Sequence, residues 1–289
     1  MNDLTRLIER AERVLERLEA ALPAAATPPD WKALAYRWRR RNGRGHLEAV
    51  HHPHRIRLAD LVGIDEQKRR LDQNTRQFVQ GRSANNVLLT GARGTGKSSL
   101  VKGALNKFAS KGLRLIEVDR NDLVDLPEIV DLVATRPERF IIFCDDLSFE
   151  ASEPGYKALK SALDGSIAGT PDNLLIYATS NRRHLMPEFM GENLEVQRGD
   201  GGEIHPGETT EEKVSLSERF GLWLSFYPFD QDLYLAICSH WLQEYGLTAA
   251  QTEAARQEAL QWALMRGARS GRIAWQFARD YAGRSARRK

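Results

Sequence analysis

Cysteine, methionine and long apolar runs are scarce in this chain of 289 residues. The two cysteines, Cys144 and Cys238, lie far apart and show neither a disulfide framework nor metal-ligand spacing, which fits a reducing cytosol. Runs of large apolar residues, such as 140–144, are too short to cross a membrane. The N-terminal residues carry Glu and Arg throughout, which argues against a signal peptide. We therefore expect a cytoplasmic protein with no membrane partner.

A strong excess of charge of one sign is absent as well. The formal net charge is only +3, so no overall field demands an anionic partner, and any basic patch must be local. The composition, 42% hydrophobic and 28% charged, is that of a globular protein. The length fits one large domain or two unequal ones.

One motif organises the chain. Residues 91–98 read GARGTGKS, which fits the phosphate-binding P-loop pattern G-x-x-x-x-G-K-[S/T]. Residues 86–90 before it form a short β-rich apolar run, and apolar residues after it recur at helical spacing. Strand, glycine-rich turn and helix are the context that the motif requires. An ordinary glycine-rich turn would not account for both the motif and its flanks.

The P-loop predicts how a nucleoside triphosphate binds. Its backbone N–H groups and the helix N-terminus cradle the phosphates, and Lys97 reaches the β- and γ-phosphates. The hydroxyl of Ser98 is expected to ligate Mg²⁺. The predicted nucleotide-binding residues of this loop are Gly91, Ala92, Arg93, Gly94, Thr95, Gly96, Lys97, Ser98 and Ser99.

A second motif lies at residues 140–146, which read FIIFCDD. A buried apolar strand that ends in an acidic pair, in a chain with a P-loop, is the Walker B pattern. Asp145 is predicted to hold Mg²⁺ through its water, opposite Ser98, and Asp146 to orient or deprotonate the attacking water. The alternative is a strand that simply ends in a polar turn.

The remaining pattern predicts an α/β fold followed by helices. Further strands are expected at 113–118, 174–181 and 223–227, with helices between them. An acidic, glycine-rich stretch at 188–218 is expected to be a loop. From Asp230 onward the pattern is wholly helical, which predicts a small bundle.

The N-terminal part divides by composition. Residues 3–21 predict an amphipathic helix, and 23–30 (PAAATPPD) read as a linker. We favour a helix docked on its own protein over a coiled coil that binds a partner. The apolar residues of this helix follow alternating spacings of four and three: Leu4, Ile8, Ala11, Leu15, Leu18 and Leu22.

Residues 31–57 are locally basic, with eight Lys or Arg residues against one Glu. Trp31, Tyr36 and Trp38 are interleaved with these charges, a mixture that could bind nucleic acid by phosphate contacts and stacking. We slightly favour the alternative, a connector whose tryptophans cover the core. The nearby sequence His-His-Pro-His at 51–54 has no companion ligands and is expected to be a loop.

Together these landmarks resemble the AAA+ ATPase superfamily. More closely, the chain is similar to an uncharacterised bacterial family of small AAA+ ATP-binding proteins over about residues 31–285. The matching stretches are GARGTGKSSLVK, FCDDLSFE, YATSNRRHL and SERFGLW.

The resemblance implies a fold and a division into segments. The fold is a three-layer P-loop NTPase with a parallel five-stranded sheet, a C-terminal helical lid and an N-terminal helical extension. The implied segments are an N-terminal helix and linker (1–30), a basic connector (31–57), the ATPase domain (58–228) and the lid with a basic tail (229–289).

The resemblance also implies roles for single residues. Gly63 and Ile64 fall where such proteins wrap the adenine, and Asn181 matches sensor 1, which helps place the lytic water. Arg219 matches the arginine finger that reaches a neighbouring subunit's nucleotide. Arg272 matches sensor 2, which reports the nucleotide state to the lid; for both arginines the alternative is an ordinary surface charge.

One departure bears on activity. Many AAA+ proteins carry Asp-Glu where this chain has Asp145-Asp146, and Glu150 could substitute only if its loop folds back. The expected function is ATP hydrolysis to ADP and phosphate by a homo-oligomer, coupled to remodelling or gating of an unknown partner. The alternative is a slow-turnover, ATP-dependent adaptor or loader on nucleic acid. A small-molecule kinase lacks an evident acceptor site.

Overall fold

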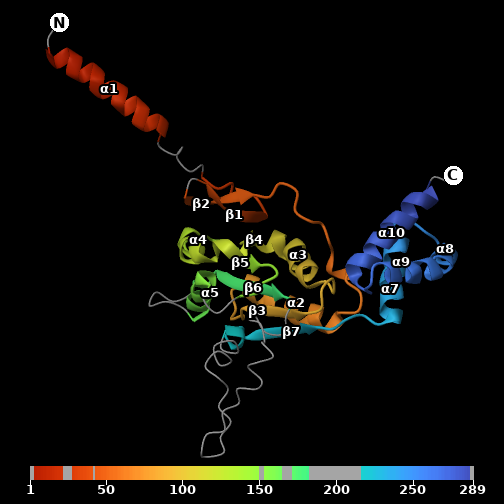
Figure 1. The fold of residues 1–289 in the computed structure, drawn as a ribbon. Coiled ribbons are helices and arrows are strands. Elements are labelled where there is room, and N and C mark those ends of the chain that lie inside the picture. Colours follow the sequence, from red (N-terminus) through yellow and green to blue (C-terminus); the bar gives the residue numbers. More distant parts are fainter. Residues whose placement is uncertain are drawn as a thin grey trace, which may run out of the picture.

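The computed structural model describes residues 3–21, 28–41, 43–149, 153–164, 171–181 and 216–286. Most of the acidic stretch at 188–218, as well as Glu150, lies outside these residues. The described chain forms one mixed sheet with helices on both faces and a group of helices at its C-terminal end (Figure 1). The predicted α/β class is therefore confirmed.

Five parallel strands form the centre of the sheet. They are β3 (Val87–Gly91), β4 (Leu113–Glu117), β5 (Arg139–Cys144), β6 (Leu174–Ser180) and β7 (Leu222–Phe226), which match the five strands expected. Their spatial order is β4-β5-β6-β3-β7. Every residue of β6 is buried, as expected for a parallel strand that helices cover on both faces.

The expected count of five strands is wrong, because the sheet has seven within the residues that the structure describes. The supposed connector supplies β1 (Ala35–Arg41), which pairs parallel to β4, and β2 (Arg44–Ala49), which pairs antiparallel to β1. Residues 36–39 of β1 alternate, so that Tyr36 and Trp38 are buried while Arg37 and Arg39 are exposed. This period of two indicates a strand, but from the sequence the segment was interpreted by its dense positive charge instead.

The aromatic residues of this segment cover the core, as the favoured alternative had it. The Trp31 ring lies 6.2 Å from that of Phe140, and the Arg136 guanidinium lies 4.4 Å from the Trp31 ring centre. Trp38 Nε1 donates a hydrogen bond of 2.9 Å to the carboxylate of Asp125. The Asp125 side chain is engaged in this contact and makes no capping hydrogen bond to the helix that follows it.

Helices cover both faces of the sheet. These helices are α2 (Asp65–Val79), α3 (Lys97–Phe108), α4 (Leu126–Val133) and α5 (Pro154–Asp164). Neighbouring strand residues belong to different cores: Ile141 packs with the side of α2 and α3, and Ile142 with the side of α4 and α5. This alternation produces three layers.

The C-terminal helices pack against the first of these cores. They are α7 (Gln231–Glu244), α8 (Ala249–Ala254), α9 (Arg256–Met265) and α10 (Gly271–Ala286), in the part of the chain where the pattern predicted helices. Helix α10 lies along α7 (Figure 1). Within the described residues, no helix is both long and apolar enough to cross a membrane.

Helix α1 (Asp3–Ala21) lies apart from the rest of the structure (Figure 1). All side chains of residues 5–14 are exposed, including Leu7 at 65% and Ile8 at 50%. The expectation that this helix docks on its own protein is therefore wrong for the described residues. A helical pattern identifies an apolar face but does not identify what covers it.

Candidate functional site

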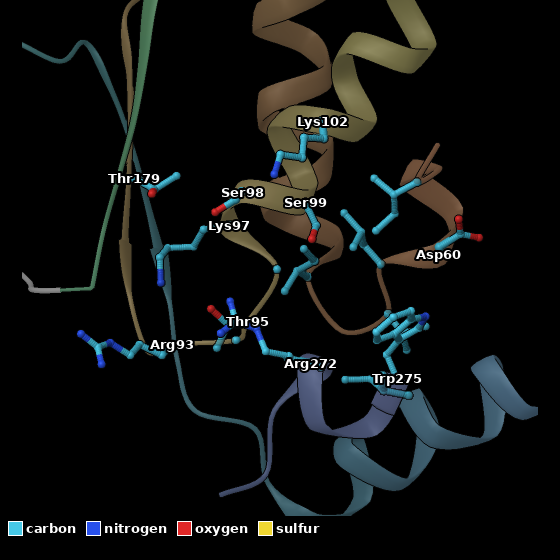
Figure 2. Close-up of a pocket in the computed structure, with 18 of the residues that line it drawn as sticks. Asp60, Arg93, Thr95, Lys97, Ser98, Ser99, Lys102, Thr179, Arg272 and Trp275 are labelled. Atoms are coloured by element: carbon cyan, nitrogen blue, oxygen red, sulfur yellow. The ribbon is translucent and has the colours of Figure 1, made fainter. Parts of the chain in front are cut away.

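A cavity of about 610 Å³ opens where the P-loop, the ends of β5 and β6, and the C-terminal helices meet. Residues 93–99 of the P-loop line it, together with Asp145, Asp146 and Asn181. The carboxyl ends of parallel strands share one edge of a sheet, which explains how residues so far apart in sequence come together. Figure 2 shows part of the lining of this cavity, with Lys97, Ser98 and Thr179 among the labelled residues.

Lys97, at the first turn of α3, is buried at the floor of the cavity. Its Nζ donates to the carbonyl oxygens of Gly91 (2.7 Å) and Ala92 (2.8 Å) and to Asn181 Oδ1 (3.0 Å). Burial lowers the pKa of Lys97 to about 8, although the carboxylates of Asp146 and Asp145 oppose the shift. Gly91 and Ala92 thus lie behind the cavity and hold the lysine through their backbone.

Ser98 and Asp145 form the second part of the site. Ser98 Oγ donates to Asp145 Oδ1 at 2.6 Å, and Thr179 Oγ1 donates to the same oxygen at 2.6 Å. The hydroxyl and carboxylate oxygens are hard donors of the kind that Mg²⁺ prefers, so these residues fit the predicted metal. Thr179 was not anticipated. It lies in β6, two positions before Asn181, which directly follows the strand.

Asp146 occupies an unusual backbone conformation, with φ of 54°. Its N–H donates to Thr179 Oγ1 at 2.8 Å, and its carboxylate accepts a hydrogen bond from Asn181 Nδ2. Thr179 therefore links both acids, and Asn181 links Asp146 to Lys97. A non-glycine residue with positive φ is uncommon and marks a place where the surroundings fix the backbone.

The other end of the cavity is apolar and aromatic. Ile64 lines it as expected, whereas Gly63 does not, although its neighbour Val62 does. Trp241 of α7 and Trp275 of α10 also line this end and were not anticipated. Sequence periodicity explains both as ordinary core residues of helices, so no signal distinguished them.

The C-terminal helices touch the P-loop directly. The N–H of Gly271, at the start of α10, donates to the carbonyl oxygen of Gly94 at 2.8 Å. Gly94 has φ of +74°, and a Cβ there would lie 2.8 Å from Ser270 Cβ, so the close approach requires glycine. Arg272 extends from α10 toward the P-loop, on the side opposite to Arg93 (Figure 2). The resemblance to AAA+ proteins implied that Arg272 belongs to the site, and Arg272 does line the cavity.

Arg219 does not line this cavity. It lies just before β7, at the end of the strand opposite to the P-loop, since Phe226 at the other end of β7 pairs with Gly91. Its guanidinium is paired with the carboxylate of Asp164 at the end of α5. Of the predicted catalytic residues, Lys97, Asp146 and Asn181 are therefore brought together, and Arg219 is held elsewhere.

Comparisons with known proteins bear on the fold. The chain is similar to a solved structure of the Aeropyrum pernix ORC1 protein in complex with DNA, at 17% identity and a TM-score of 0.53, covering 79% of this chain and 62% of that one. It is also similar to a chain of the E. coli MS115-1 HORMA:CdnC:Trip13 complex, at 15% identity and a TM-score of 0.50, covering 78% and 90%. At these identities the likeness shows the fold alone. No curated protein matches the chain.

A family model matches residues 31–285, which is most of the chain. It spans the β1–β2 hairpin, the P-loop, the acidic strand end and the C-terminal helices, and it leaves α1 outside. The solved neighbours share the fold of AAA+ ATPases. The chain therefore belongs to the family described as protein of unknown function (DUF815).

Proposed function

We propose that this protein is a Mg²⁺-dependent AAA+ ATPase that couples its nucleotide state to the remodelling or gating of a partner. One observation carries the proposal. A continuous chain of hydrogen bonds joins Lys97, Asn181, Asp146, Thr179 and Asp145 to Ser98 along the floor of the cavity. A merely structural strand end would not need a buried lysine, two acids and an amide at one point.

The residues of this chain suit hydrolysis of a terminal phosphate. Lys97 binds the β- and γ-phosphates and offsets the charge that develops in the transition state. Asp146 orients the attacking water and accepts its proton, and Asn181, in contact with both Lys97 and Asp146, positions that water beside the γ-phosphate. The Ser98 and Asp145 oxygens would hold Mg²⁺, which supplies neutralising charge to the phosphates.

The apolar end of the cavity suits a nucleobase. Ile64 and Val62 come from the segment before α2, while Trp241 and Trp275 come from the C-terminal helices. A base bound between these two parts would join them, so that the position of the C-terminal helices depends on the nucleotide. Arg272 would report the phosphates to those same helices, which is the lid role that we assign to them.

A second candidate function is a slow switch on nucleic acid, and the state of Asp146 favours its slow turnover. Its carboxylate is already engaged by Asn181, and it is one methylene shorter than glutamate. Nucleic-acid binding by residues 31–57 has less support. Trp38 is buried, and Arg37 and Arg39 pair with Glu117 at 2.8 Å and Glu48 at 3.6 Å.

Nucleotide-induced stabilisation tests the binding half of the proposal. Mg²⁺ with ATP at 100 times its Kd should stabilise the wild type by about 2.7 kcal/mol and raise its Tm. Lys97→Ala should lose this increase while remaining folded. Arg41→Ala, which changes an exposed residue at the end of β1, is the matched control and should retain it. Equal ATP-induced shifts in the wild type and Lys97→Ala would refute the site.

A further inference from the structure

Helix α1 presents an apolar face that nothing else in the described structure covers. Leu7, Ile8 and Val14 are 65%, 50% and 50% exposed, and the helix lies away from the sheet (Figure 1). An isolated helix of 19 residues is marginally stable in water, and the exposed Glu9–Arg13 pair adds only a few tenths of a kcal/mol. Such a helix needs a partner that buries its face.

The apolar positions follow a heptad repeat. If Ile8 is assigned to position a, then Leu4 and Ala11 fall at d, and the a and d series continues in sequence through residues 15, 18 and 22. Leu7 and Val14 fall at g, which widens the seam to three positions of seven. A seam of that width is typical of a helix in a multi-helix bundle.

The charges of α1 argue against a membrane or nucleic acid as the partner. The helix carries five acids and four arginines, no lysine and no aromatic residue. Helices that lie in a membrane surface are rich in Lys and Arg on the polar face and carry Trp or Phe on the other. A segment with net negative charge is also repelled by phosphates.

We propose that α1 is a self-association element that assembles with α1 of other copies of this chain as a parallel helical bundle. Copies of one helix share the same seven-residue repeat. In a parallel arrangement the a and d positions of each copy therefore meet the a and d positions of the others at the same level. This proposal concerns residues that the family match leaves outside, and it does not depend on ATP binding.

The acidic residue at the middle of α1 sets the direction. Glu12 is the central residue of Asp3–Ala21 and falls at position e. In an antiparallel pair the e positions face each other, so Glu12 would lie beside its own copy, which is unfavourable. In a parallel bundle position e faces the g position five residues earlier in the neighbour, so that Leu7 offers apolar surface to the stem of Glu12.

Sedimentation of the full-length chain without nucleotide tests the proposal. The wild type should have a mass that is a multiple of 32.7 kDa. Ile8→Glu with Val14→Glu should reduce the mass to that of one chain. The matched control, Arg6→Gln with Arg13→Gln, changes the net charge by the same amount on the opposite face and should leave the assembly intact. ATP binding by all of these variants should be unchanged, which shows that they are folded.

Disulfide formation tests the direction. Leu4→Cys places a thiol in the seam near one end of the helix, where copies meet in a parallel bundle and form a disulfide under mild oxidation. Arg6→Cys places a thiol on the outer face of the same turn and should not form one. In an antiparallel pair the two Leu4→Cys thiols would be roughly 24 Å apart, at 1.5 Å per residue, and would stay reduced.

Three results would overturn the proposal. The first is a wild-type chain that remains a monomer at tens of micromolar. The second is an oligomer that survives Ile8→Glu with Val14→Glu, which would assign the assembly to another surface. The third is a wild-type monomer that binds vesicles of phosphatidylserine and phosphatidylcholine through these same residues, which would assign α1 to a membrane.

Discussion

At the scale of single residues, the proposed function depends on the protonation of Lys97. Burial lowers its pKa to about 8 in the nucleotide-free protein, against 10.5 for an ordinary lysine. A lysine with a lowered pKa stabilises the folded protein while its side chain is neutral. This contribution to stability is present above the pKa of an unfolded lysine and is lost as the pH falls through the folded pKa. Bound phosphates reverse this preference, because they favour the charged ammonium.

Nucleotide binding should therefore take up a proton at alkaline pH. Near pH 7 Lys97 is already charged, and little uptake is expected, whereas near pH 9 uptake should approach one proton per ATP. Calorimetric titration in buffers of different ionisation enthalpy measures this number. Lys97→Arg keeps its charge and should show no such uptake; a wild type without uptake at pH 9 would mean that Lys97 does not meet the phosphates.

The length of the Asp146 side chain is the second prediction at this scale. Asp146→Glu lengthens the carboxylate toward that of related proteins and should raise the rate of phosphate release if the short side chain limits it. The positive φ of 54° is expected to make this variant less stable. Residues other than Asn, Asp and Gly lose about 1–2 kcal/mol of stability in this left-handed conformation. Comparison of Tm with the rate separates the two effects, and a stable variant with an unchanged rate would show that length is not limiting.

At the scale of elements, the β1–β2 hairpin shows where the sequence was informative and where it was not. Short, uniformly apolar strands such as 140–144 were predicted well, because a strand that is buried on both faces is a continuous run of apolar residues without charges. Strand β1 is exposed on one face and carries four arginines. The segment was therefore interpreted by its charge, and the alternation that buries Tyr36 and Trp38 was missed.

The candidate site divides in the same way. The P-loop and the acidic strand end have fixed spacing within one segment, so the positions of Lys97, Ser98 and Asp145 in the cavity could be predicted. Trp241 and Trp275 line the cavity because α10 packs on α7 and its first residue, Gly271, contacts the P-loop, which no local pattern encodes.

The hairpin contact should contribute measurably to stability. Trp38→Phe removes the hydrogen bond to buried Asp125, and Arg40 at 3.2 Å compensates only in part, so a loss of about 1–3 kcal/mol is expected. Urea unfolding measures it. Trp31→Phe shortens a neighbouring indole that makes ring contacts in the described structure, and it should cost less. Equal losses would show that ring size, and not the hydrogen bond, matters.

The loop before α2 should tolerate no side chain at Gly63. It has φ of +79°, and a Cβ there would lie 2.3 Å from Leu233 Cδ1 in α7. Gly63→Ala should therefore combine backbone strain with overpacking, each about 1–3 kcal/mol, and weaken ATP binding by moving Ile64 or α7. Gly112→Ala has a similar φ of +89° with nothing within 4 Å, so it carries the strain alone. Identical midpoints in urea would argue against the α7 contact.

At the scale of the whole molecule, the finger role predicted for Arg219 would require more than one chain in the active species. It lies at the end of β7 away from its own P-loop and pairs with Asp164. An arginine that a neighbour supplies to the γ-phosphate contributes on the order of 10³–10⁵-fold to turnover in other P-loop enzymes. A surface arginine would contribute almost nothing, so the two interpretations are easily separated.

Mixing inactive variants tests this arrangement. Arg219→Ala should bind ATP normally and hydrolyse it poorly, and adding Lys97→Ala should restore some activity by pairing an intact P-loop with an intact arginine. Asp164→Asn breaks the ion pair but keeps Arg219, so it should remain active. Full activity of Arg219→Ala alone would assign Arg219 to the surface.

Phosphate release from ATP in the presence of Mg²⁺, by the wild type and by Asp146→Asn, tests the central claim most directly. Asn accepts the positive φ of this position and keeps the size of the side chain, but it cannot take a proton from water. We predict repeated turnover by the wild type, with none when Mg²⁺ is chelated, and bound but unhydrolysed ATP in Asp146→Asn. Equal rates in the two proteins, or a wild type that binds ATP without ever releasing phosphate, would contradict the account.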